Sequence, residues 1–210
     1  MQYLIELLGV GVFAVSGVLA AGRKNLDMFG AAVIAVVTAI GGGTLRDLLL
    51  NRHPIFWIAD STYLLVMLGA TVVALSYVRI WVASRHALLI VDALGLAFFT
   101  IGGVKIAQTT GHSAPIAVLM GTITGTFGGV LRDVLTAEIP MVLRPGRLYA
   151  TAAIVGGSLY VFLAWCGVPR SPSAFIGMAA IAALRFAAII WNLELPTVKL
   201  PEEKNSNAAI

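Results

Sequence analysis

Charged residues and cysteine are scarce in this sequence of 210 residues. Only 11% of the residues are charged, against about 25% in an ordinary soluble domain. The single cysteine, Cys166, excludes an internal disulfide. The sequence lacks a nucleophile–base constellation, a phosphate-binding loop and a cluster of metal ligands, which argues against an enzyme. Its basic residues are spread over many short loops rather than gathered in a stripe, which argues against nucleic-acid binding.

Long apolar segments make up most of the chain, which is 59% hydrophobic. A helix of about 20 apolar residues spans about 30 Å of hydrocarbon. Seven segments have about this length: Tyr3–Gly22, Met28–Leu50, Thr62–Val82, Ala87–Thr109, Ala114–Thr136, Leu148–Cys166 and Ala174–Trp191. We therefore predict an all-α integral membrane protein with seven transmembrane helices and a polar tail.

The basic residues of the loops predict the orientation of the chain in the membrane. Loops on one side, together with the tail, hold Arg23, Lys24, Arg79, Arg85, Arg144, Arg147, Lys199 and Lys204. Loops on the other side hold only Arg52 and Arg170. Because basic residues are enriched in cytoplasmic loops, the N-terminus is expected outside and the C-terminus in the cytoplasm of a cell whose plasma (inner) membrane holds the protein.

An internal repeat appears when the sequence is shifted against itself by 86 residues without a gap. Gly42-Gly43, Leu45, Arg46 and Asp47 then coincide with Gly128-Gly129, Leu131, Arg132 and Asp133, and flanking residues coincide as well. Each copy holds three spans, so the second copy must enter the membrane from the opposite side, as in transporter folds. The predicted units are residues 1–84 and 85–168 as inverted repeats, 169–192 as a seventh helix and 193–210 as a cytoplasmic tail.

Adjacent glycines interrupt the second and fifth segments at matching places. Glycine costs about 1 kcal/mol relative to alanine in a helix interior, so a run of glycines weakens the helix there. Such interruptions at corresponding positions of two repeats indicate a transport pathway, although close helix packing alone would also explain them. We predict kinked or broken helices at Gly41, Gly42, Gly43, Gly128 and Gly129.

Ionisable residues inside spans are functional candidates, because each costs at least about 2.5–3.5 kcal/mol near the bilayer centre. They are Glu6, Arg46, Asp47, Asp92, Lys105, Arg132, Asp133 and Arg185. Glu6 and Arg46 fall in the outer halves of their helices, and Asp92 and Arg132 in the inner halves. We predict that Glu6 contacts Arg46 and that Asp92 contacts Arg132. Snorkelling to the headgroups is the competing role for these charges.

Two of these charges have no equivalent in the other repeat. Lys105 corresponds to Leu19, so no repeated partner neutralises it. It either pairs with Glu6 or Asp47 and controls a pathway by moving, or it snorkels outward. Arg185 in the seventh span requires a polar partner or a place at an interface.

The doubled Gly-Gly-x-x-Arg-Asp motif in three-helix repeats, with a seventh helix, resembles the prokaryotic members of the trimeric intracellular cation (TRIC) channel family. The resemblance covers Tyr3 to Trp191 and implies a homotrimer with one pore per subunit, passing K⁺ and Na⁺ between the second and fifth helices. It also implies a gating role for Lys105. Animal members bind phosphoinositides, and the basic cytoplasmic loops here would attract anionic lipid headgroups.

Two functions remain open on the sequence. A monovalent cation channel would line its pore with kinked backbone and with Ser16, Thr38, Thr44, Thr124 and Thr126. A secondary transporter of glycine or a similar small solute is the alternative, since inverted repeats are typical of transporters. Neither function calls for a cofactor or a tightly bound metal.

Overall fold

A computed structural model describes residues 2–80, 85–145 and 148–196. The end of the third predicted span at Val82 and the tail beyond residue 196 lie outside these ranges. Eight helices occur in the described part of the chain: α1 (Gln2–Arg23), α2 (Met28–Leu49), α3 (Phe56–Ala59), α4 (Thr62–Ile80), α5 (Arg85–Thr109), α6 (Ala114–Leu135), α7 (Ala150–Trp165) and α8 (Arg170–Trp191). The seven predicted spans correspond to all of these except the short α3, which the sequence did not indicate.

Six of the described helices are long and apolar enough to cross a membrane, namely α1, α2, α4, α5, α6 and α8. The seventh, α7, has 16 residues and is shorter than the others. At 1.5 Å per residue it spans about 24 Å, somewhat less than an average hydrocarbon layer. Predicted and observed helices therefore agree in number and position, with α7 as the short one.

Most helices end in the same kind of turn, in which one residue with positive φ reverses the chain. These residues are Asn25, Asn51, Gly111, Ala137 and Gly167. In each turn the next amide donates to the carbonyl five residues earlier, as Glu138 does to Asp133 at 2.8 Å. This is the Schellman pattern, which satisfies the last carbonyls of a helix. The turns fix the backbone of the residues beside them, including Lys24, Arg52 and Glu138.

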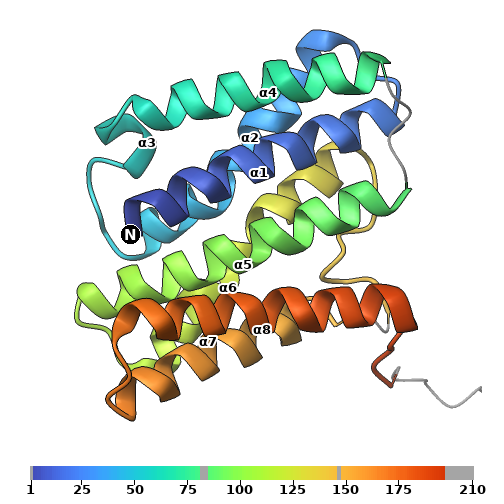
Figure 1. Cartoon of the computed structure of the whole chain (residues 1–210). Coiled ribbons are helices and arrows are strands. Elements are labelled where there is room, and N and C mark those ends of the chain that lie inside the picture. The colour runs from blue at the N-terminus through green and yellow to red at the C-terminus, as the bar shows by residue number, and fades with distance from the viewer. Residues whose placement is uncertain (1, 81–84, 146–147, 197–210) are drawn as a thin grey trace, which may run out of the picture.

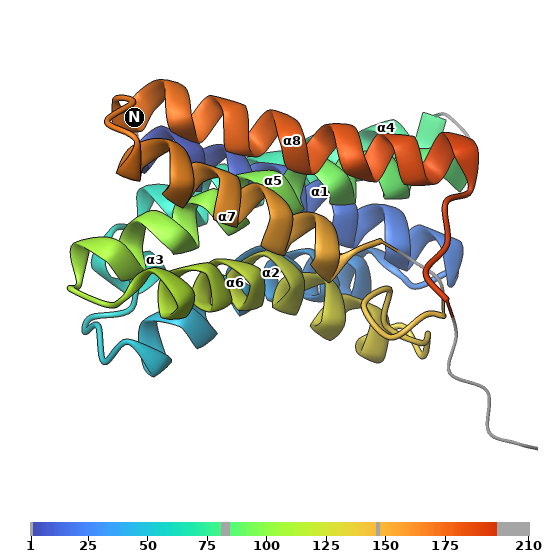
Figure 2. The same cartoon turned by 90° about the horizontal axis from the view of Figure 1, so that it is seen from below.

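The helices form two layers (Figures 1 and 2). One layer contains α4, α1, α5 and α8 in that order, and the other contains α2, α6 and α7, with α1 packed on α2 and α5 on α6. The equivalent helices α1 and α5 run in opposite directions, as do α2 and α6 (Figure 1), which agrees with inverted repeats. The seventh helix breaks the symmetry, because α8 lies against α5 where α4 lies against α1.

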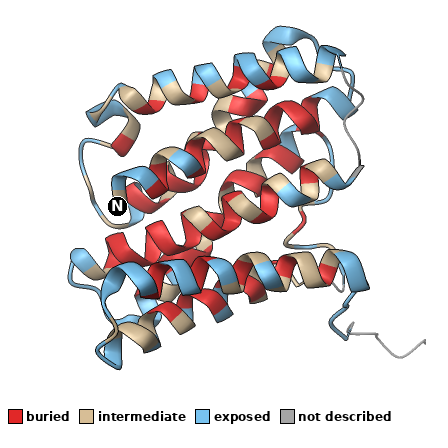
Figure 3. Cartoon of the chain, viewed as in Figure 1, coloured by how far each residue is buried: buried red, intermediate tan, exposed pale blue. Residues whose placement is uncertain are grey.

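Burial follows this arrangement, with the buried residues concentrated on the central helices (Figure 3). Phe13 and Phe99 are both buried and stack with ring centroids 5.1 Å apart, joining α1 to α5. Large apolar side chains such as Leu65 and Ile190 are instead exposed on the outer helices. An apolar outer surface of this kind is typical of contact with lipid.

Two ends of the molecule are distinguished below. The N-terminal end carries the N-terminus, α3 and the turns between α5 and α6 and between α7 and α8 (Figure 1). The opposite end carries the turn between α1 and α2, the connection between α6 and α7, and the end of α8.

Candidate functional site

A buried network of charges lies in the first repeat and confirms the predicted pair of Glu6 and Arg46. Arg46 Nη1 donates to Glu6 Oε1 at 3.0 Å, and Arg46 Nε donates to Asp47 Oδ1 at 2.8 Å. The hydroxyl of Tyr63 on α4 donates to Glu6 Oε2 at 2.8 Å. Charges this deeply buried are tolerated only when they are paired and hydrogen-bonded. The network therefore ties α1, α2 and α4 together.

The second repeat contains the same network at the same spacing and confirms the second predicted pair. Arg132 Nη1 donates to Asp92 Oδ1 at 2.7 Å, and Arg132 Nε donates to Asp133 Oδ1 at 2.8 Å. The hydroxyl of Tyr149, just before α7, donates to Asp92 Oδ1 at 3.2 Å. The two networks lie at opposite ends of the bundle because the repeats are inverted.

The aspartates of the two Arg-Asp motifs also hold the connections that follow their helices. Asp47 Oδ2 accepts from the amide of Phe56 at 2.9 Å, and Asp133 Oδ2 accepts from the amide of Met141 at 2.8 Å. Each aspartate thus binds an arginine with one oxygen and a loop backbone with the other. The two Arg-Asp motifs therefore hold the connections that follow α2 and α6.

One contact of the networks joins the two repeats. Arg132 Nη1 also donates to Ser16 Oγ on α1, so Ser16 is buried against an arginine instead of offering a free hydroxyl. The position equivalent to Ser16 is Gly102, which has no side chain to bind Arg46. Within the described part of the chain, the hydrogen bonds of Arg46 accordingly go to Glu6 and Asp47 of its own repeat. The two otherwise similar networks therefore differ in how strongly they connect the repeats.

The glycines do not break the helices, because α2 and α6 continue through Gly41–Gly43 and Gly128–Gly129, and the predicted kinks stay a prediction. Packing across the helix pair explains the glycines instead. A Cβ on Gly42 would overlap the carbonyl oxygen of Thr124, and a Cβ on Gly128 would overlap that of Thr38. The two contacts are equivalent under the repeat. The glycines bring the two backbones together, and the packing energy of that approach offsets their low helix propensity.

The threonines predicted to line a pore mostly bind their own helices. Thr38, Thr124 and Thr126 donate to the carbonyls of Ile34, Met120 and Thr122, each four residues earlier. Thr44 accepts instead from the indole of Trp57 at 3.1 Å. This bonding satisfies hydroxyls that would otherwise be buried without a partner. Thr38, Thr124 and Thr126 thus use their hydroxyl hydrogens within their own helices, whereas the oxygen of Thr44 is occupied by Trp57.

Lys105 and Arg185 are the two charges that the repeat did not explain. Lys105 is buried, with 8% of its surface exposed, and no carboxylate of the described residues lies within ion-pair distance of it. The predicted pairing with Glu6 or Asp47 is therefore not formed. Arg185 donates to the carbonyl of Leu148 at 3.1 Å and stacks 4.8 Å from the ring of Tyr149. These contacts supply one polar partner for Arg185, while its Nε and Nη2 have no hydrogen-bond partner among the described residues.

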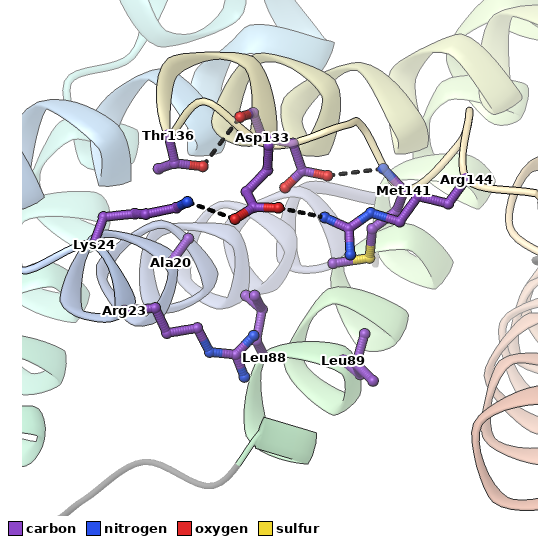
Figure 4. Close-up of a pocket in the computed structure, with 10 residues that line it drawn as sticks. Ala20, Arg23, Lys24, Leu88, Leu89, Asp133, Thr136, Met141 and Arg144 are labelled. Atoms are coloured by element: carbon purple, nitrogen blue, oxygen red, sulfur yellow. Dashed lines mark hydrogen bonds and ion pairs between the residues drawn. The ribbon is translucent and has the colours of Figure 1, made fainter.

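A pocket of about 570 Å³ opens at the opposite end of the molecule between α1, α5 and α6 (Figure 4). Its lining combines cations, carboxylates and apolar side chains: Ala20, Arg23, Lys24, Leu88, Leu89, Asp133, Thr136, Glu138, Met141 and Arg144. Asp133 is almost fully buried, with 5% of its side chain exposed, so the pocket reaches the charge network of the second repeat.

Sequence reasoning missed several residues of this site. Tyr63 and Tyr149 complete the two networks, and their separation of 86 residues was a signal that the repeat alignment already contained. Lys24 and Glu138 form an ion pair across the pocket. They were not singled out, because Lys24 was read only as a sign of topology and Glu138 lies outside the predicted spans.

The chain is similar to proteins that have been described before. A family model for "Glycine transporter" matches it twice, at residues 3–79 and 89–165, with the offset of the internal repeat. A UPF0126 membrane protein of Vibrio cholerae is 46% identical over 95% of this chain and 84% of its own length. The UPF0126 inner membrane protein YadS of Escherichia coli is 43% identical over 96% of this chain and 98% of its own length.

Solved structures agree with these relatives. A trimeric intracellular cation channel orthologue from Rhodobacter sphaeroides superposes with a TM-score of 0.87 and 40% identity, over 91% of this chain and 98% of its own. A prokaryotic TRIC channel determined in KCl superposes with a TM-score of 0.84 and 33% identity, over 92% and 98% of the two chains. The fold is therefore that of TRIC channels, with two inverted repeats, and the relatives are not enzymes.

Proposed function

We propose that this chain, which belongs to the glycine transporter family of membrane proteins, forms a homotrimeric channel for K⁺ and Na⁺ with one pore per subunit. The observation that carries the proposal is the similarity to the Rhodobacter sphaeroides channel, with a TM-score of 0.87 and 40% identity over almost the whole of both chains. That relative is described as trimeric and as a cation channel. On this similarity we extend both properties to the present chain.

The pore is proposed to run between α2 and α6. Their backbones meet at Gly42 and Gly128, where not even a methyl group fits, so a hydrated ion does not pass there in this conformation. A small separation of the two helices would uncover the carbonyl oxygens of Thr38 and Thr124, which face the partner helix. Backbone carbonyls replace the hydration shell of monovalent cations. We propose that the path is closed at this contact and opens by movement of α2 against α6.

Charged side chains would shape the path on either side of this contact. Asp133 at the end of the pocket would attract cations, whereas Lys105 on α5 would repel them. Lys105 has no ion-pair partner among the described residues, and we propose that it responds to the membrane potential. Arg46, Glu6, Asp92 and Arg132 are proposed to hold the helices around the path rather than to meet the ion.

The location follows from the relatives and from the charges. YadS is described as an inner membrane protein, and the same location is proposed here. The opposite end carries Arg23, Lys24, Arg79 and Arg144 in the described chain, so it is proposed to face the cytoplasm. Anionic lipids would be attracted to this end.

A secondary transporter of glycine or a similar small solute is the second candidate. The description of the family model favours it. The pocket of about 570 Å³ also places carboxylates beside cations, a combination that suits a zwitterion, which carries both charges.

Reconstitution into planar bilayers separates the two candidates. A channel gives unitary K⁺ currents with a rate far above the turnover of a carrier, and Na⁺ carries similar currents. Saturable uptake of glycine into vesicles, without unitary currents, would overturn the channel. The mass of the complex in detergent tests the trimer in the same preparation.

A further inference from the structure

Lys24 and Glu138 form an ion pair that joins the two repeats across the mouth of the pocket. Lys24 Nζ lies 2.5 Å from Glu138 Oε1, and Arg144 binds the other oxygen of the same carboxylate at 3.3 Å. Arg144 Nε in turn donates to the carbonyl of Ile139 at 2.7 Å. In Figure 4, Lys24 and Arg144 approach the middle of the pocket from opposite sides. Arg144, in the same loop, therefore holds the carboxylate of Glu138 in position for Lys24.

The backbone on both sides of this pair is fixed. Lys24 directly follows α1 in a Schellman turn at Asn25, and Glu138 directly follows Ala137 in the turn that ends α6. Exposed ion pairs are usually weak, because two long side chains lose conformational freedom when they meet. Here the two turns fix the backbone and Arg144 holds the carboxylate of Glu138, so less conformational freedom is lost when the ion pair forms. The pair therefore connects two helix ends rather than two mobile loops.

Among the described residues, a comparison of the two repeats finds this connection at one end of the molecule and not at the other. The positions equivalent to Lys24 and Glu138 are Thr110 and Arg52. The hydroxyl of Thr110 donates to the carbonyls of its own helix, α5, and Arg52 binds Asp47 of its own repeat at 3.0 Å. Neither reaches across to the other repeat. The contact between Arg132 and Ser16 is also absent at the N-terminal end, where Gly102 replaces the serine.

The geometry points to a latch: the ion pair of Lys24 and Glu138 holds the end of α1 against the connection after α6 and keeps the pocket narrow at this end. Behind the latch lies Asp133, the innermost carboxylate of the pocket. Release of the latch would let the end of α1 move away from α6 and would widen access to Asp133. The inference rests on the proposed function, in which α6 forms one wall of the path, and it takes the pocket beside α6 as the cytoplasmic mouth of that path.

Charge reversal tests the latch independently of transport. In a Cys166→Ala background, Thr136→Cys places a thiol in the wall of the pocket. The rate at which a water-soluble thiol reagent labels this cysteine in detergent reports the width of the mouth. Lys24→Glu or Glu138→Lys should each raise the rate about two- to five-fold, the size of effect that one part-exposed ion pair supports. The double exchange Lys24→Glu/Glu138→Lys should return the rate toward that of the parent.

Arg79→Glu is the matched control, because it reverses a charge outside the pocket at the same end of the molecule. It should leave the labelling rate unchanged. Equal rates in the parent and both single reversals would overturn the latch, as would a double exchange that labels as fast as the single variants. Bilayer recordings of the same variants should show a higher open probability at unchanged unitary conductance. Faster labelling without any currents would support the latch and contradict the channel. Currents with unchanged labelling would support the channel and contradict the latch.

Discussion

Asp92 and Arg132, forty residues apart in the sequence, form an ion pair of 2.7 Å in which neither side chain is exposed. Glu6 and Arg46 repeat this pair at the same separation in the other half of the molecule. Each pair joins the first helix of a repeat to the second. The two buried pairs, related by the inverted repeat, therefore connect helices near both ends of the bundle.

Breaking one of these pairs is expected to destabilise the protein strongly. Asp92→Ala leaves the buried guanidinium of Arg132 with a single carboxylate, Asp133. Removal of one partner of a buried pair typically costs about 3–5 kcal/mol. Reversible unfolding in detergent should show a loss of this size. Arg52→Gln, which affects a part-exposed pair with Asp47, is the control and should cost less than about 1 kcal/mol. Equal losses for the two variants would contradict the assignment.

The contact between α2 and α6 predicts opposite effects for two glycines. Gly42→Ala places a methyl group against the carbonyl of Thr124, and overpacking of this kind costs about 1–3 kcal/mol. Gly69→Ala on α4 meets open space and should be neutral or stabilising by up to about 1 kcal/mol. Thermal unfolding of both variants in the same detergent checks the difference. A Gly42→Ala protein as stable as Gly69→Ala would show that the helices are not in contact there.

Lys105 is expected to limit the K⁺ current. Lys105→Leu makes this position equivalent to Leu19 of the first repeat. A unit charge about 10 Å from the ion contributes about 1–2 kcal/mol at an effective dielectric constant of about 20, so its removal should raise the K⁺ conductance by up to about tenfold. Unitary conductance in symmetric KCl measures this. Lys105→Arg keeps the charge and serves as the control. A conductance unchanged by Lys105→Leu would show that Lys105 does not lie near the ion path.

The pH dependence of the latch follows from Glu138. The hydrogen bond and the charge of Lys24 hold the pKa of Glu138 below its ordinary value of 4.5, with smaller contributions from Arg144 and Arg23. A carboxylate with a lowered pKa in the folded state stabilises that state above its unfolded pKa, and the contribution is lost as the pH falls through the folded pKa. Labelling of the cysteine introduced by Thr136→Cys should therefore stay constant from about pH 8 to about pH 5, once corrected for the reactivity of the thiol itself, and rise only at lower pH. A rise already near neutral pH would contradict the role of Glu138.

Much of the fold was accessible from the sequence, because apolar length and an ungapped repeat are local properties. The seven segments, the inversion and both acid–arginine pairs followed from them. The pairs were predictable since each residue type recurs at the same offset and at the same depth, and a buried arginine requires a carboxylate. The same reasoning could have included Tyr63 and Tyr149, which recur at that offset too.

Contacts between the repeats were decided only by the tertiary structure. A sequence shows which residues share a helix face, but how two such faces dock depends on the packing of the whole bundle. For this reason Ser16 meets Arg132, Lys24 meets Glu138, and Gly42 lies against Thr124 without a break in α2. The sequence by itself determined that two inverted halves exist and what neutralises their charges. The docking of those halves brings Lys24 against Glu138 and Ser16 against Arg132 at one end, whereas the equivalent residues Thr110 and Gly102 make no such contact among the described residues at the other.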